Sequence, residues 1–152
     1  MKETARIAKL LEDIYEGDPW IDVTLTGTLK NISPAGAANK IDPWNSIWEI
    51  VNHIISWRET VLQRVQGIVV DSPADNYFKP VTDQSENAWQ RTLQDLKISQ
   101  DKWNTFLEKM TEDDLEKINP KNNSSYYNNI HGIIQHDAYH LGQIVLLAKK
   151  SK

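Results

Sequence analysis

Apolar residues recur at helical spacing along four long stretches of this chain, and this pattern limits the folds that the chain can adopt. The stretches cover approximately residues 4–15, 45–65, 82–110 and 124–149. In the first, a stripe with i, i+3, i+4, i+7 spacing is formed by Ile7, Leu10, Leu11 and Ile14. No segment shows the apolar–polar alternation that is typical of a β-strand. The sequence therefore predicts an all-α protein.

Long connections separate the predicted helices. Within them we expect short helices over residues 25–32, 35–38 and 115–118, and a loop over residues 119–123. A polar run with two prolines, residues 71–83, forms a long connection between the second and third long helices. Such connections favour a four-helix bundle with long crossover connections, in an up-down-down-up arrangement. We expect residues 1–152 to form one domain.

The composition is that of an ordinary globular protein and excludes several functions. The 152 residues are 39% hydrophobic and 25% charged, and the net charge of −4 argues against nucleic acid as a partner. The chain has no cysteine, so disulfides, a cysteine nucleophile and thiolate metal ligands are excluded. We expect no signal peptide, because the first residues carry both charge signs and no apolar stretch, and no apolar run reaches transmembrane length. We therefore expect a cytoplasmic protein with no membrane partner.

Three of the four histidines occupy positions from which they can share one ion. His136 and His140 are one turn apart on the fourth long helix, so their rings lie on the same face. His53 falls inside the apolar stripe of the second long helix, between Ile50 and Ile54. If these helices pack together, three neutral imidazoles can hold a divalent metal ion and leave a coordination position open.

A simpler interpretation stays open for each histidine taken alone, namely a partly buried ring that makes ordinary hydrogen bonds. Three such rings on apolar stripes are costly unless their nitrogens find partners, and a shared cation would satisfy all three. Zinc, nickel, iron(II) and manganese all accept imidazole. A three-histidine site with an open position is typical of catalytic zinc, which lowers the pKa of bound water to about 7.

Other residues near the histidines receive weaker assignments. His131 is rotated about 140° from His136 at roughly 100° per residue, so it should point elsewhere. Asp137 is expected to be solvated and Tyr139 to be a packing residue. The remaining aromatic candidates are expected to lie mainly in the core, and they are Trp44, Trp48, Trp57, Trp89 and Trp103. Trp57, one turn beyond His53, can also wall the site.

No pattern identifies a general acid or base, and the candidates for a catalytic role are Glu49 and Gln143. Glu49 precedes His53 by one turn, but an exposed carboxylate near a helix N-terminus is the favoured interpretation. Gln143 follows His140 by about one turn. It can line a pocket or make an ordinary interhelix hydrogen bond.

The chain resembles the DinB-like (YfiT-related) superfamily, a large bacterial group regarded as metal-dependent enzymes. The resemblance spans most of the chain and includes residues 20–38 and the sequence SIWEIVNHIISW at residues 46–57. Its most specific part is HDAYHLGQI at residues 136–144. In that family a histidine on the second long helix and an H-x-x-x-H pair on the fourth bind a divalent metal, often nickel or zinc.

Carried over by resemblance, the metal ligands are His53, His136 and His140, and the fold is a four-helix bundle that is commonly a homodimer. The resemblance also implies a small-molecule substrate. Some members are thiol-dependent transferases or isomerases that use bacillithiol or mycothiol, and others are described as hydrolases.

Three functions follow as hypotheses. The first is a bacillithiol-type S-transferase, in which the metal activates a low-molecular-weight thiol for attack on a small electrophile. The second is a metal-dependent hydrolase that uses metal-bound water. The third is a non-catalytic helical stress protein whose metal only braces the bundle. The lack of a clear general base favours the thiol mechanism slightly.

Overall fold

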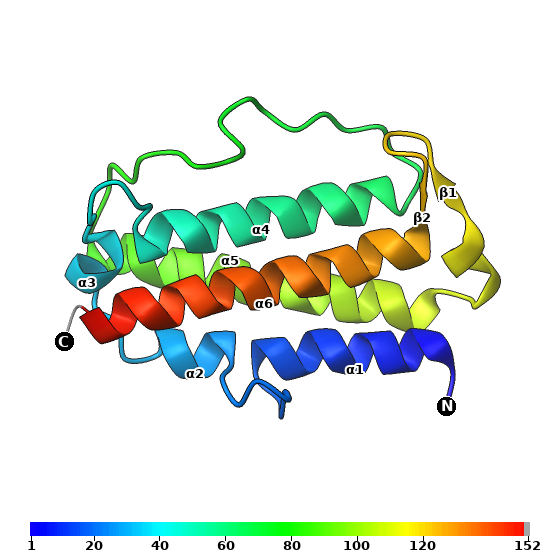
Figure 1. The fold of residues 1–152 in the computed structure, drawn as a ribbon, viewed down its shortest axis with the longest axis horizontal. Helices are drawn as coiled ribbons and strands as arrows, with labels where there is room; N and C mark the ends of the chain where they lie inside the picture. Colours follow the sequence, from blue (N-terminus) through cyan, green and yellow to red (C-terminus); the bar gives the residue numbers. More distant parts are fainter. Residues whose placement is uncertain (151–152) are drawn as a thin grey trace.

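A computed structural model describes residues 1–150, over which four long helices pack side by side (Figure 1). They are α1 (Glu3–Tyr15), α4 (Ile47–Arg64), α5 (Glu86–Lys109) and α6 (Tyr126–Lys150). Side chains set where two of them begin, because Ser46 accepts a hydrogen bond from the backbone N–H of Glu49 and Ser85 accepts one from that of Ala88. The all-α fold expected from the apolar stripes is confirmed.

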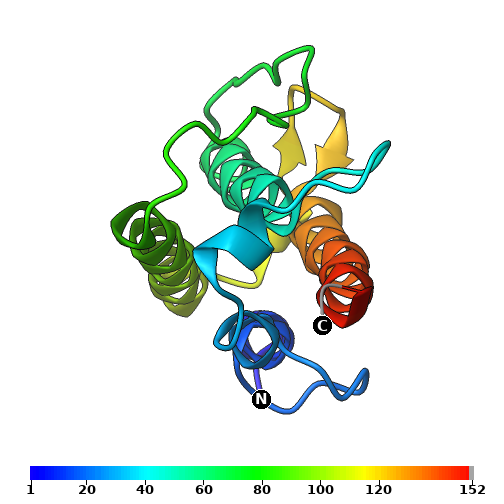
Figure 2. The same ribbon diagram turned by 90° about the vertical axis from the view of Figure 1, so that its left-hand side faces the viewer.

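The long helices follow the expected up-down-down-up order. In Figure 1, α1 and α6 run in one direction, and α4 and α5 run in the other. Seen from one end, α4 and α1 occupy opposite corners of the bundle, with α5 and α6 between them (Figure 2). Helix α6 therefore packs antiparallel to α4 and directly beside it, and a shared histidine site requires that these two helices are neighbours.

Two long connections have different paths. The crossover segment, residues 65–85, runs the length of the bundle beside α4 to join two parallel helices (Figure 1). The earlier connection instead folds into α2 (Leu25–Leu29) and α3 (Pro34–Ala38). Helix α2 continues the row that α1 begins, so the short helices fill one end of the bundle.

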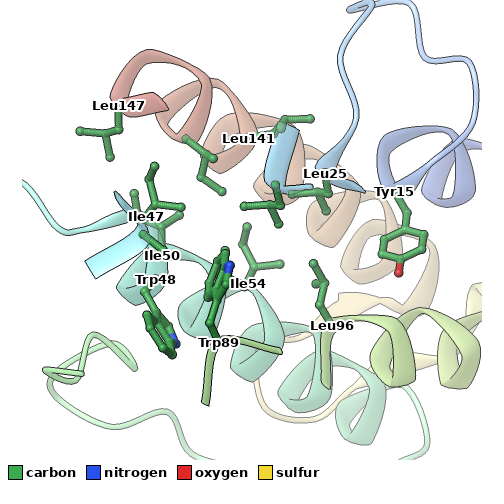
Figure 3. Packing of buried hydrophobic residues seen from close by; sticks show 14 of the residues in the cluster. Tyr15, Leu25, Ile47, Trp48, Ile50, Ile54, Trp89, Leu96, Leu141 and Leu147 are labelled. Atoms are coloured by element: carbon green, nitrogen blue, oxygen red, sulfur yellow. The ribbon is translucent and has the colours of Figure 1, made fainter. Parts of the chain in front are cut away.

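Buried side chains form two adjoining clusters. The first joins α4, α5 and α6 to the end of α1 and to the short helices α2 and α3, and it contains Trp48 and Trp89, with ring centroids 5.0 Å apart (Figure 3). The second surrounds Trp103. Each indole N–H has an acceptor: Thr92 Oγ1, the carbonyl of Ile32 and the carbonyl of Arg58, respectively. These three tryptophans are core residues, as expected, and their polar atoms are satisfied.

The connection between α5 and α6 differs from the sequence prediction. The expected helix over residues 115–118 is a 3-10 turn, η1 (Asp113–Glu116). The expected loop over residues 119–123 begins inside a two-residue strand, β1 (Ile118–Asn119), and residues 120–123 connect it to β2 (Ser124–Ser125), with which it pairs antiparallel. A two-residue ladder is too short to produce alternation in the sequence, so the pattern could not reveal it.

Among the described residues, no helix combines the length and apolar character that crossing a lipid bilayer requires.

Candidate metal centre

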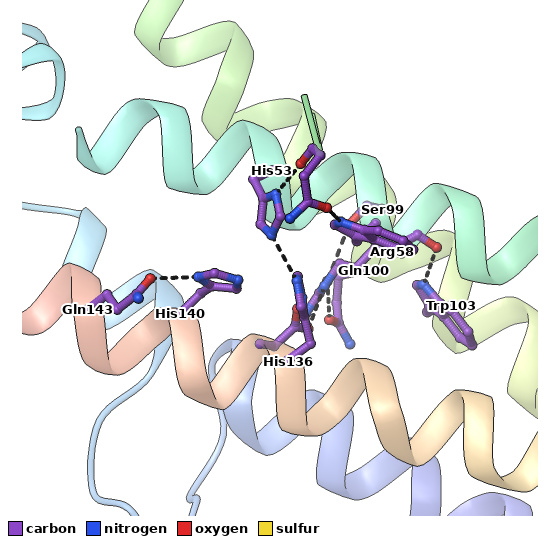
Figure 4. Close-up of polar contacts among 11 residues, drawn as sticks. His53, Arg58, Ser99, Gln100, Trp103, His136, His140 and Gln143 are labelled. Carbon is purple, nitrogen blue, oxygen red and sulfur yellow. Dashed lines mark hydrogen bonds and ion pairs between the residues drawn. The ribbon is translucent and has the colours of Figure 1, made fainter. Parts of the chain in front are cut away.

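The rings of His53, His136 and His140 converge between α4 and α6 (Figure 4). One ligand nitrogen from each ring lies within 4.8 Å of the other two. The Nε2 atoms of His53 and His136 are 3.0 Å apart, and the ring centroids are 4.4–4.9 Å from one another. The antiparallel packing of α4 and α6 thus brings together the three rings that the sequence singled out.

Hydrogen bonds to the outer nitrogens orient two of the rings. His53 Nδ1 lies 2.6 Å from the backbone oxygen of Asn76, so it must donate its N–H there. His140 Nδ1 lies 2.7 Å from Gln143 Oε1 and donates to it. In the neutral ring, a proton on Nδ1 leaves Nε2 with a lone pair. Both rings therefore present a lone pair on Nε2, the atom that a metal ion would use.

Burial keeps these two rings neutral. It lowers the pKa of His53 from 6.5 to about 4, and it also lowers the pKa of His140. Phe78 stacks on His53, with ring centroids 3.9 Å apart, and covers one face of the ring. Neutral imidazole is the form that binds a metal ion, so both rings are ready to bind at pH 7 without losing a proton.

The three histidines line a cleft of about 930 Å³. Most of its other walls are apolar or aromatic, and they include Ile50, Trp57, Phe78, Leu146 and Leu147. Trp44 and Tyr139 also line the cleft but are 57% and 65% exposed. The expectation that these two residues lie in the core or pack internally was therefore wrong. A helical stripe does not indicate where a cleft interrupts the packing.

Asp137 is also placed differently from the prediction. Its carboxylate is fully buried and accepts a hydrogen bond of 2.8 Å from Nε of Arg58, which is itself fully buried. Asp137 does point away from the histidine face, as expected. On that side of α6 it meets Arg58 inside the bundle and not solvent. Arg58 NH1 also donates to Ser99 Oγ and Gln100 Oε1, so α4, α5 and α6 share this polar cluster.

The two candidate catalytic residues have well-defined partners. Glu49 is buried, not exposed as expected, because its carboxylate accepts from the backbone N–H of Ser46 and from Nζ of Lys40. It therefore completes a capping box at the start of α4. Gln143 lines the cleft, and its hydrogen bond goes to His140 on its own helix, not to another helix.

Sequence reasoning missed the contribution of the crossover segment. Asn76 accepts from His53 through its backbone and from Trp57 Nε1 through its side chain, at 2.8 Å for the latter. Phe78 covers His53. The one available signal was the length of this segment, because long structureless connections are often functional. His131, in contrast, lies against Tyr127 with centroids 4.3 Å apart, away from the cluster as expected.

A helical bundle with three converging histidines in the wall of a cleft defines a class of proteins that can hold a metal ion. The model of one family, the DinB superfamily, matches residues 23–144, which include all three histidines. The chain therefore belongs to the DinB superfamily, as its resemblance indicated. Comparisons with curated proteins and with solved structures gave no match.

Proposed function

We propose that this protein is a metal-dependent enzyme in which His53, His136 and His140 hold one divalent ion. The observation that carries the proposal is the convergence of their ligand nitrogens in the wall of an open cleft. Three neutral nitrogen ligands suit zinc or nickel best, and iron(II) or manganese is also compatible. When bound, such an ion lowers the pKa of a thiol or water molecule at its open position and stabilises the resulting anion.

The preferred reaction is S-transfer from a low-molecular-weight thiol to a small electrophile. Among the described residues that line the cleft, none is Asp or Glu, so no carboxylate is in place to act as a general base for water. A thiol needs less assistance because its pKa is already near 8.5. In this reaction a bond forms between sulfur and carbon, the leaving group departs with the electron pair of its broken bond, and the thiol proton passes to solvent.

The residues of the chain bind and orient the reactants. The apolar walls formed by Ile50, Trp57 and Phe78 can take the apolar part of a small electrophile and exclude water around it. Gln143 and Asn76 fix the rings of His140 and His53. Glu49 takes part in no chemical step, because its carboxylate already accepts hydrogen bonds from Lys40 Nζ and the backbone N–H of Ser46. The proposal includes a homodimer, as the resemblance implies, and a cytoplasmic location, as expected from the composition of the sequence.

Two alternatives belong to the same site. Metal-assisted hydrolysis uses water in place of the thiol, and it predicts turnover of an activated ester or amide without any thiol. A metal that only braces the bundle would be sealed from solvent, as structural sites are. The cleft beside the histidines favours a catalytic role over this bracing role.

The test compares the wild-type protein with His53→Ala and with His131→Ala, which removes a histidine outside the cluster. We expect elemental analysis to find one divalent ion per chain in the wild type and in His131→Ala, and none in His53→Ala. With glutathione or bacillithiol, the wild type and His131→Ala should conjugate monochlorobimane, with chloride as the leaving group, and His53→Ala should not. Metal-dependent ester hydrolysis without thiol would favour the hydrolase, and no turnover of either kind would contradict the enzyme proposal.

A further inference from the structure

Two buried atoms beside the metal centre lack partners and lie close to each other. His136 Nδ1 and Asp137 Oδ1 are both buried, and neither has a hydrogen-bond partner within residues 1–150. They are 3.8 Å apart, just beyond hydrogen-bonding distance. Unsatisfied buried polar atoms are costly, so a pair of them next to a candidate site calls for a physical explanation.

The hydrogen bond between His53 and His136 explains why the pair is unsatisfied. His53 carries its proton on Nδ1, which donates to Asn76, so its Nε2 can only accept. His136 Nε2, 3.0 Å away, must then be the donor. The neutral His136 ring consequently has a lone pair, and no proton, on Nδ1. A lone pair cannot bond to a carboxylate oxygen, so the two atoms stay apart.

Arg58 holds the Asp137 carboxylate as a fixed acceptor. The Nε of its guanidinium donates to Asp137 Oδ2 at 2.8 Å. Its NH1 group is held in turn by Ser99 and Gln100 at 3.2 and 2.9 Å. The carboxylate therefore has one oxygen anchored by Arg58 and the other, Oδ1, directed to the side of His136.

We propose that Asp137 is a positioning residue that accepts a hydrogen bond from the Nδ1–H of His136 when a metal ion is bound. The inference rests on the metal site of the proposed function. A ring that binds an ion through Nε2 carries its proton on Nδ1, so binding exchanges one tautomer of His136 for the other without changing its charge. The new N–H can donate to Asp137 Oδ1, and both unsatisfied atoms gain a partner.

The direct test observes the ring nitrogens of the full-length wild-type protein by NMR with ¹⁵N-labelled histidine. Without metal, we expect the Nδ1 signal of His136 to be that of an unprotonated nitrogen. With one equivalent of Zn²⁺, the same nitrogen should become protonated. A His136 Nδ1 that is unprotonated in the zinc-loaded protein, or already protonated in the neutral ion-free ring, would overturn the inference and leave the metal site standing.

A substitution tests the same point through affinity. In Asp137→Asn, we expect the amide oxygen to accept from Arg58 and the amide N–H₂ to donate to His136 Nδ1. This contact stabilises the His136 tautomer that is protonated on Nε2 and cannot bind a metal ion through that atom. We expect Zn²⁺ affinity, measured by competition with a chromophoric chelator, to fall about 10- to 100-fold. The matched control is Glu12→Gln, which changes a carboxylate that contacts Gln100 and Asn104 but no histidine.

The control should bind Zn²⁺ as tightly as the wild type. Affinity within twofold of wild type for Asp137→Asn would contradict the inference. If Asp137→Asn does not fold, the NMR measurement on the wild type decides alone. A wild-type protein that binds no Zn²⁺ would overturn the proposed function together with this inference, whereas normal binding without the tautomer change would overturn the inference alone.

Discussion

At the scale of single residues, the hydrogen-bond acceptors beside the candidate metal centre determine which ring nitrogen of a histidine is available to an ion. His53 donates to a backbone oxygen, and His140 donates to the side chain of Gln143. A substitution at Asn76 leaves its backbone oxygen in the chain, whereas a side-chain acceptor such as Gln143 Oε1 can be removed. Gln143 is therefore the point at which the orientation of a single ring can be tested without touching a histidine.

We expect Gln143→Leu to weaken Zn²⁺ binding about tenfold, because the His140 ring loses the acceptor that fixes its tautomer. Gln143→Glu keeps an acceptor at the same place and should bind Zn²⁺ at least as tightly as the wild type. Competition with a chromophoric chelator measures both affinities. Equal weakening in both variants would show that the acceptor is not the cause.

The histidines themselves could be predicted from the sequence, but their polar surroundings could not. The spacing of His136 and His140 fixes a shared helix face, whatever the tertiary structure. The same helix periodicity correctly predicted that Asp137 points away from that face. It could not predict that α4 packs on the side of Asp137 and places Arg58 against it. The missed signal was Arg58, which occurs four residues after Ile54 on an apolar stripe and so required a buried partner.

At the scale of elements, a capping box fixes the residue at which α4 begins. Ser46 and Glu49 form reciprocal hydrogen bonds, and Lys40 neutralises the buried carboxylate. This cap fixes the helix from which His53 projects, two turns further along. Glu49 therefore supports the site through the helix and does not act at the cleft.

Ser46→Ala removes the side-chain acceptor of this capping box, and we expect the free energy of unfolding to fall by about 1 kcal/mol. Ser33→Ala, which removes the equivalent cap of the five-residue helix α3, should cost less because fewer packed residues depend on it. Urea denaturation followed by circular dichroism measures both. A larger loss in Ser33→Ala than in Ser46→Ala would contradict this view of α4.

Where the crossover segment contacts α4, two of its residues have an unusual backbone conformation. Asn76 and Tyr77 both have positive φ angles, of 55° and 63°. Asn tolerates this region better than most residues, and the side chain of Asn76 gains a contact with Trp57. Tyr77 bonds to Thr60 through its hydroxyl at 2.7 Å. These contacts join the crossover segment to α4 and depend on tertiary structure. The sequence could therefore predict a long connection but not its path.

Replacing Asn76 should loosen this segment to a degree that depends on the substitute. Asn76→Gly loses the contact with Trp57 but adopts the positive φ readily, whereas Asn76→Ala loses the contact and adds backbone strain of about 1 kcal/mol. We expect hydrogen exchange of the amides in residues 71–83 to be faster in both variants and fastest in Asn76→Ala. Unchanged exchange in Asn76→Ala would show that other contacts hold the segment.

At the scale of the whole molecule, burying histidines makes stability depend on pH. The folded-state pKa of His53, about 4, lies below its ordinary value of 6.5, and the pKa of His140 is lowered as well. Between these two pH values the unfolded chain binds more protons than the folded one. Stability in the ion-free protein therefore rises with pH through this window and is lost as pH falls toward 4.

We expect the free energy of unfolding of the ion-free protein to increase from pH 4 to pH 6.5, and the contribution of His53 to be constant above that. Carboxylates also titrate at the acid end of this range, so the informative quantity is the difference between wild type and His53→Ala. That difference should shift in favour of the wild type as pH rises. A difference that is constant from pH 4 to pH 6.5, measured by urea denaturation, would contradict the assigned pKa.

The order of the helices along the chain has a consequence for how a cell would load the site. His53 precedes His136 by 83 residues. During synthesis, α4, the crossover segment and α5 leave the ribosome before α6, so a nascent chain offers an ion one imidazole from this cluster and no partner for it. The complete set of three ligands that we propose for the ion therefore forms only when the last long helix, α6, has docked beside α4.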